Sequence, residues 1–153
     1  MTHRTIVLDA NILIRAVLGV RVRRLISDHA AEVSFFAPDT AYAEARAHLP
    51  AILEKRGMNS AAMLAMLDAL EPVVQPIETE MYQPLKQKAQ ARISDRDPDD
   101  WPALACALML GCPVWTEDAD FFGTGVATWT TNRVQLYLGS QPADKTRDEP
   151  DAT

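Results

Sequence analysis

The segment that most constrains the fold is the run ALACALML at 103–110, which consists of good helix formers and has no polar face. A helix that is apolar on every side is stable only when it is buried. Gly111 suits the left-handed position that ends a helix, and Pro113 blocks its continuation. The next three residues, VWT at 114–116, have the character of a short core strand. The segment therefore predicts a buried helix followed directly by a buried strand.

Acidic residues cluster at both ends of this helix-strand unit. Before the helix the chain carries Asp97, Asp99 and Asp100, and after the strand it carries Glu117, Asp118 and Asp120. One interpretation is structural: Asp99 or Asp100 caps the helix and complements its dipole, and the later acids form a polar turn. Taken singly, each acid fits that interpretation, but the number of acids favours a functional site.

The rest of the chain alternates between strand and helix patterns. Strands are predicted at 5–8, 33–37, 72–77, 114–116 and 126–130, and helices at 10–18, 21–30, 39–49, 60–70, 79–93, 102–110 and 132–138. We expect Asn11, Asn59 or Ser60, and Thr131 or Asn132 to cap the helices that follow them, and Pro50 to end its helix. This alternation predicts the α/β class, a three-layer α/β/α sandwich around a mainly parallel sheet of four to five strands.

In such folds the functional site lies at the carboxyl ends of the strands. Asp9 and Asp118 follow strands, Asp100 begins a helix, and Glu44 lies on the helix after the second strand, so all four can meet in one crevice. Carboxylates crowded together repel one another unless a cation compensates. Oxygen-only ligands suit Mg²⁺ or Mn²⁺, and these ions serve phosphoryl transfer.

Composition indicates the domain organisation and the cellular location of the protein. With 153 residues, 48% hydrophobic content and two cysteines without metal-ligand spacing, residues 1–138 are expected to form a single domain that needs no disulfide. Residues 139–153 read as a disordered acidic tail. We find no membrane segment or signal peptide, and expect a cytoplasmic protein.

The net charge of −6 is the wrong sign for holding nucleic acid through bulk charge. A bound metal ion would supply the positive field locally. The basic residues Arg15, Arg21, Arg23 and Arg24 form either a solvated face or an RNA-binding surface that contacts the phosphate backbone.

Four segments together resemble the PIN domain, and in particular VapC-type toxins of bacteria: VLDANILI, PDTAYAEARAHL, DDWPALACALMLGCPVWTEDADF and VATWTT. The resemblance spans roughly residues 4 to 138. It implies a sheet in the order 3-2-1-4-5 and a Mg²⁺- or Mn²⁺-dependent endoribonuclease that cleaves RNA with a metal-activated water.

The resemblance also implies roles for individual residues. Asp9, Glu44, Asp100 and Asp118 are the catalytic acids, with Asn11 and Thr116 in support. Asp9, Asp100, Asp118 and Asp120 would hold the metal, and Asp120 is also a second candidate, beside Asp118, for the fourth acidic position. The implied partners are an RNA substrate, an antitoxin protein if the chain is a toxin, and a second copy in a homodimer.

Other classes fit less well. A haloacid-dehalogenase-like enzyme would have a second Asp at the position of Asn11, and a receiver domain would have a lysine after a late strand. A catalytically inactive PIN-like module that binds RNA or protein stays an alternative, although such a module would typically have lost one of the acids.

Overall fold

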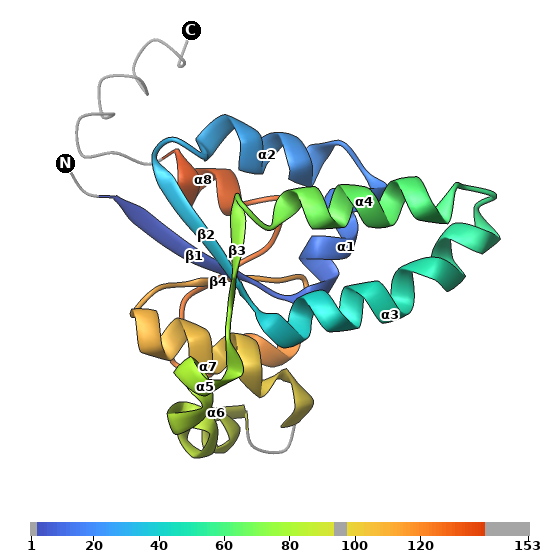
Figure 1. The fold of residues 1–153 in the computed structure, drawn as a ribbon. Helices are drawn as coiled ribbons and strands as arrows, with labels where there is room; N and C mark the ends of the chain where they lie inside the picture. The colour runs from blue at the N-terminus through green and yellow to red at the C-terminus, as the bar shows by residue number, and fades with distance from the viewer. Residues whose placement is uncertain (1–2, 94–97, 140–153) are drawn as a thin grey trace, which may run out of the picture.

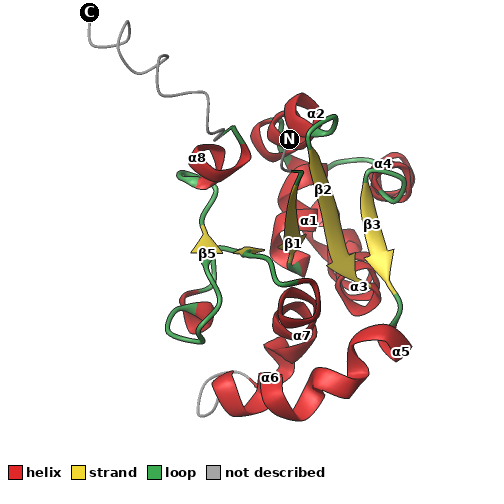
Figure 2. Ribbon diagram, turned by 90° about the vertical axis from the view of Figure 1, so that its left-hand side faces the viewer, coloured by secondary structure: helices red, strands yellow, loops and turns green. Residues whose placement is uncertain are grey.

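The chain folds around a five-stranded parallel sheet, seen in a computed structural model that describes residues 3–93 and 98–139. The strand order is β3-β2-β1-β4-β5, as expected, and every neighbouring pair is parallel. The strands are β1 (Arg4–Leu8), β2 (Val33–Pro38), β3 (Val74–Ile77), β4 (Val114–Trp115) and β5 (Thr128–Trp129). Figure 2 shows β1, β2 and β3 side by side, with β5 on the far side of β1.

Helices cover both faces of the sheet, which gives the expected three layers (Figure 1). One group comprises α1 (Ala10–Leu18), α2 (Arg21–His29), α3 (Asp39–Lys55), α4 (Ser60–Leu70) and α8 (Val134–Leu138). The other comprises α5 (Thr79–Tyr82), α6 (Lys86–Ile93) and α7 (Trp101–Leu110). Three short 3₁₀ turns complete the described chain: η1 (Gln83–Leu85), η2 (Pro98–Asp100) and η3 (Ala119–Phe121).

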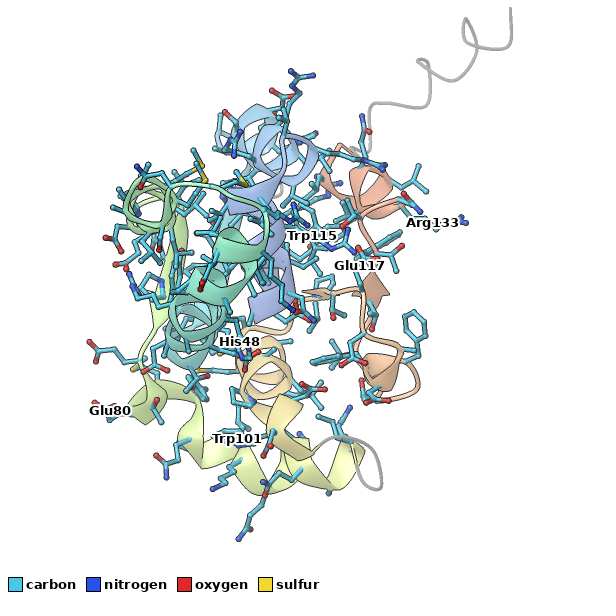
Figure 3. All side chains as sticks on the ribbon, turned by 90° about the vertical axis from the view of Figure 1, so that its right-hand side faces the viewer. His48, Glu80, Trp101, Trp115, Glu117 and Arg133 are labelled. Carbon is cyan, nitrogen blue, oxygen red and sulfur yellow. The ribbon has the colours of Figure 1, made fainter. Side chains whose placement is uncertain are left out.

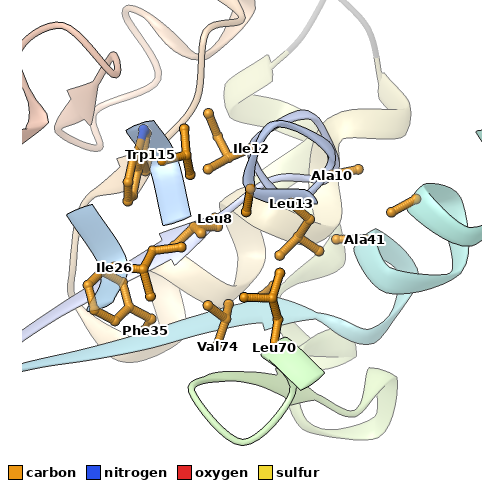
Figure 4. Close-up of a cluster of buried hydrophobic side chains, with 14 of the residues drawn as sticks. Leu8, Ala10, Ile12, Leu13, Ile26, Phe35, Ala41, Leu70, Val74 and Trp115 are labelled. Atoms are coloured by element: carbon orange, nitrogen blue, oxygen red, sulfur yellow. The ribbon is translucent and has the colours of Figure 1, made fainter. Parts of the chain in front are cut away.

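The core is split by the sheet into two hydrophobic clusters. Along β1, Ile6 and Leu8 belong to the cluster on the α1 side, and Val7 belongs to the cluster around α7, as the two-residue period of a strand requires. Figure 4 shows the first cluster, in which Leu8 and Ile12 lie close to Trp115. The predicted burial of the apolar run is confirmed for residues 103–107, whereas Leu108 and Met109 are partly buried and Leu110 is exposed.

Proline positions explain two differences from the predicted helices. The helix predicted to end before Pro50 continues to Lys55 as α3. Pro50 removes one hydrogen bond, but Leu49 and Leu53 on either side are fully buried, and this packing keeps the chain helical. The single helix predicted over 79–93 is interrupted by η1, which contains Pro84.

The predicted strands agree with the structure more closely than the predicted helices do. Pro76 is tolerated inside β3 because β3 is an edge strand that pairs only with β2. The last strand is shorter than predicted, with only Thr128 and Trp129 paired to β4.

Helix capping follows the sequence at one of three predicted sites. Asn59 caps α4, its side chain accepting a hydrogen bond from the Ala62 N–H. For α1 the expectation of Asn11 is wrong, because Asp9 is the cap. No side chain caps α8, and the Thr131 hydroxyl instead accepts a hydrogen bond from Trp115 Nε1 at 3.1 Å.

Two predictions concern parts of the chain outside this description. The acidic tail, apart from Gly139, and the acid Asp97 lie outside the described residues. Among the residues that are described, none of the helices has the length and apolar character to cross a membrane.

Candidate metal centre

Four predicted acids line one small pocket, of about 50 Å³, where β1 and β4 end and α3 and α7 begin. They are Asp9, Glu44, Asp100 and Asp118, which come from four separate segments of the sequence. The parallel sheet brings them together, because β1 and β4 are neighbours that end at the same edge. We call this site the acidic pocket.

Asp9 is the most constrained of these acids. Its Oδ1 accepts a hydrogen bond from the Ile12 N–H at 3.1 Å, and its Oδ2 accepts one from the Thr116 hydroxyl. Burial raises the pKa of Asp9 to about 6; the hydrogen bonds from Thr116 and Ile12 lower it, and repulsion from Asp118 and Glu44 raises it. A cation beside Asp9 would favour its ionised form.

Thr116 connects two of the acids. This fully buried residue follows β4, and its hydroxyl donates to Asp9 while accepting the Asp118 N–H at 2.9 Å. One side chain therefore fixes both the carboxylate after β1 and the backbone that carries the carboxylate after β4. The support expected from Thr116 has a physical basis in this bridge.

A tight group of carboxylates adjoins Asp9. Asp100, Asp118 and Asp120 each offer one oxygen, and these oxygens lie within 4.8 Å of one another. Asp118 also accepts the Asp120 N–H at 2.9 Å, which holds the turn that presents both side chains. Three half-buried carboxylate oxygens match the hard oxygen ligands that Mg²⁺ and Mn²⁺ require, so the donor set fits such an ion.

The position of Asp100 bears on the capping interpretation of this residue. Asp100 occupies the N-cap position of α7, but its side chain makes no capping hydrogen bond to that helix. The buried helix α7 instead places this carboxylate beside Asp118. Asp99 also lines the acidic pocket, as an exposed residue, and it was not among the predicted site residues. Its adjacency to Asp100 was the only signal.

Glu44 reaches the pocket from the second turn of α3, and the start of α3 is held by Asp39. The Asp39 carboxylate accepts hydrogen bonds from the Thr79 N–H, at 2.9 Å, and from the Tyr82 hydroxyl, at 2.7 Å. Partial burial raises the pKa of Asp39, but the hydrogen bonds from Tyr82 and Thr79 outweigh it and hold the pKa below its usual value of 3.8. Asp39 thereby ties the start of α3 to α5.

This network predicts a pH-dependent contribution to stability. A lowered native pKa stabilises the fold above the unfolded pKa, and this gain disappears as the pH falls through the native value. Asp39→Asn should therefore lower the free energy of unfolding at about pH 7, and this effect should be smaller at about pH 3, below the pKa of an unfolded aspartate. Urea denaturation of both proteins at the two pH values measures this. An equal difference at both would show that the Asp39 charge does not contribute.

The remaining predicted residues differ in their surroundings. Asn11 lines the acidic pocket and is exposed. Arg15, Arg21 and Arg24 are exposed, whereas Arg23 donates hydrogen bonds to the Ala16 carbonyl oxygen at 2.9 Å and to Met66 Sδ at 3.1 Å. Arg23 thus joins α2 to α1 and α4.

The fold and the site define an α/β protein with a carboxylate pocket at the carboxyl ends of parallel strands. The family model described as PIN domain matches residues 7–139. The chain therefore belongs to the PIN domain family, as its sequence motifs indicated.

Solved structures with the same fold include proteins of three bacteria. VapBC2 from Rickettsia felis, bound to a DNA fragment from its promoter, matches with a TM-score of 0.61 and 13% identity. The match covers 82% of this chain and 98% of the VapBC2 chain. VapBC-1 from nontypeable Haemophilus influenzae matches with a TM-score of 0.54 and 16% identity. This match covers 84% of this chain and 98% of the VapBC-1 chain. FitAcB from Neisseria gonorrhoeae matches with a TM-score of 0.55 and 20% identity, and the match covers 82% of this chain and 97% of the FitAcB chain. No curated protein matches the sequence.

Proposed function

We propose that this chain is an endoribonuclease that depends on Mg²⁺ or Mn²⁺ and hydrolyses phosphodiester bonds of RNA. The observation that carries the proposal is the gathering of Asp9, Glu44, Asp100 and Asp118 in one pocket. Such a concentration of carboxylates is unfavourable without a cation, and a cation turns the same pocket into a phosphate site.

The positions of the acids suggest a division of tasks among them. Asp100, Asp118 and Asp120 would hold the ion, because their oxygens form the tight group. Asp9, fixed by Thr116, supplies a further negative charge beside them. Glu44 is exposed at the pocket and would accept a proton from an attacking water. A bound divalent ion would polarise the phosphate and lower the pKa of water.

Cleavage of RNA by the purified protein tests this proposal. With a labelled single-stranded RNA, we expect cleavage in Mn²⁺ or Mg²⁺ and none in EDTA. The control is His48→Ala, because His48 is an exposed histidine of α3 (Figure 3) that does not line the acidic pocket. Cleavage that persists in EDTA and is lost in His48→Ala would contradict the proposal. Metal-dependent RNA binding without cleavage would favour an inactive binding module.

We further propose that the chain is the toxin of a type II toxin-antitoxin pair. The VapC-type motifs support this assignment, as do the two VapBC proteins and FitAcB among the structures with this fold. The expected partners are an antitoxin protein and a second copy of the chain, and the expected location is the cytoplasm. Co-expression with the product of a short neighbouring reading frame tests the pairing: a stable complex that suppresses cleavage is the expected result.

A further inference from the structure

A second and larger cavity, of about 650 Å³, lies next to the acidic pocket. Its polar lining is Arg15, Arg21, Arg56, Glu117, Thr131 and Asn132. We call it the arginine cavity. A volume of this size falls in the range that holds a small organic ligand.

The two cavities share their supporting elements. On α1, Asn11 lines the acidic pocket and Arg15 lines the arginine cavity, and four residues of helix correspond to about 6 Å along the axis. After β4, the consecutive residues Glu117 and Asp118 line the arginine cavity and the acidic pocket, respectively. In Figure 3, Glu117 lies between Trp115 and Arg133. A strand of RNA at one cavity would therefore pass the other.

The arginine cavity has the opposite charge to the rest of the chain. Its three guanidinium groups and one carboxylate leave a formal charge of +2, whereas the whole chain carries −6. Arg21 donates a hydrogen bond to Asn132 Oδ1 at 3.0 Å. Within the described residues, neither Arg15 nor Arg56 forms an ion pair with a carboxylate. Both can therefore bind an anion without breaking an existing interaction.

The carboxylate of Glu117 indicates which anion fits. Its Oε2 accepts the Thr131 N–H at 2.7 Å, so the side chain is held in place within the cavity lining. A carboxylate would repel a bare phosphate but can accept an N–H group from the edge of a base. Guanidinium groups together with a fixed carboxylate suit a nucleotide, which presents both kinds of group.

We propose that the arginine cavity binds the nucleotide of the RNA strand that flanks the scissile phosphate. This inference rests on the proposed function and names a subsite for its substrate. Arg15, Arg21 and Arg56 hold the phosphate, and Glu117 faces the base. Arg56, at the end of α3, joins the site, whereas Arg23 is engaged between helices and Arg24 does not line the cavity.

Binding of RNA without cleavage tests the subsite. We compare the wild-type chain with Arg15→Ala/Arg56→Ala, using the anisotropy of a labelled single-stranded RNA in EDTA over a series of salt concentrations. The matched control is Lys55→Ala/Lys88→Ala, which removes two exposed positive charges that line neither cavity. Each lost phosphate contact lowers the slope of log affinity against log salt by about 0.7 for a single strand.

The expected result is a loss of affinity of at least tenfold for the arginine variant, with a salt slope shallower by about 1.4. The lysine variant should keep its affinity within about twofold and keep its slope. Equal losses in both variants, or no loss in either, would overturn the subsite. So would displacement of the RNA by inorganic phosphate at the same concentration of phosphate groups.

The two proposals fail separately. Binding through the arginine cavity by a protein that cleaves no RNA would refute the nuclease and leave the arginine cavity as an RNA-binding site. Metal-dependent cleavage by a protein whose arginine variant binds RNA normally would refute only the subsite.

Discussion

Asp100→Asn should reduce metal-dependent RNA cleavage by a factor on the order of a hundred to a thousand. The charge stabilisation that a metal ion supplies in the transition state is worth several kcal/mol, and each 1.36 kcal/mol corresponds to a factor of ten in rate. Asp100 contributes one of the three oxygens in the tight group with Asp118 and Asp120. Asn keeps the shape and one oxygen of the side chain, so the change isolates the charge.

The matched control for this change is Asp28→Asn. Asp28 is an exposed aspartate on α2 and lines neither cavity, so the control makes the same charge change elsewhere. Single-turnover cleavage rates of the three proteins, at several Mn²⁺ concentrations, measure the effect. Equal rates in Asp100→Asn and Asp28→Asn would remove Asp100 from the site.

Trp115→Ala should cost about 3 to 5 kcal/mol in the free energy of unfolding, the range for removing a large buried aromatic residue. Trp115 is fully buried, and its ring lies 6.5 Å from that of Phe35 between centroids. Its Nε1 donates to Thr131, so the substitution also takes away the hydrogen-bond donor of that buried hydroxyl.

Leu136→Ala provides the comparison for Trp115→Ala. Leu136 is 60% exposed on α8, so its truncation should change the free energy of unfolding by no more than about 0.5 kcal/mol. Urea denaturation of the two variants measures both values. A cost below about 1 kcal/mol for Trp115→Ala would mean that β4 is not part of the core.

Sequence patterns predicted the fold because most strands and helices have a clear local signal. The apolar run of α7, with Gly111 in the left-handed conformation at φ 66°, is the clearest example. The four acids could be predicted as a group because the carboxyl ends of parallel strands share one edge of a sheet. Position along the sheet, and not spacing in the sequence, brings Asp9 close to Asp118.

The features that the sequence did not predict depend on tertiary contacts. Pro50 stays inside α3 because Leu53 is buried beyond it. Arg23 differs from its neighbour Arg24 only in what lies near it, the carbonyl group of Ala16. Arg56 joins the arginine cavity from a helix that is distant in sequence, so no local pattern could group it with Arg15.

The bridge through Thr116 is another tertiary feature. A threonine after a buried strand fits many roles, and only the register of β4 beside β1 places its hydroxyl on Asp9. The choice of Asp9 over Asn11 as the cap of α1 has the same origin. The carboxylate accepts from the Ile12 N–H and from Thr116 at once, whereas Asn11 is exposed.

The most direct test of the central claim, that the acidic pocket holds a divalent ion, is a set of melting curves of the wild type and Asp100→Asn with and without Mn²⁺. An ion that binds only the folded state stabilises it by RT ln(1 + [L]/Kd), about 2.7 kcal/mol at a hundred times Kd. We predict that Mn²⁺ raises the melting temperature of the wild type and that the variant loses most of this rise. Without metal, the variant should melt at the same temperature or higher, because one of three repelling charges is gone. Equal Mn²⁺ shifts in both proteins, with the variant uniformly less stable, would contradict the account.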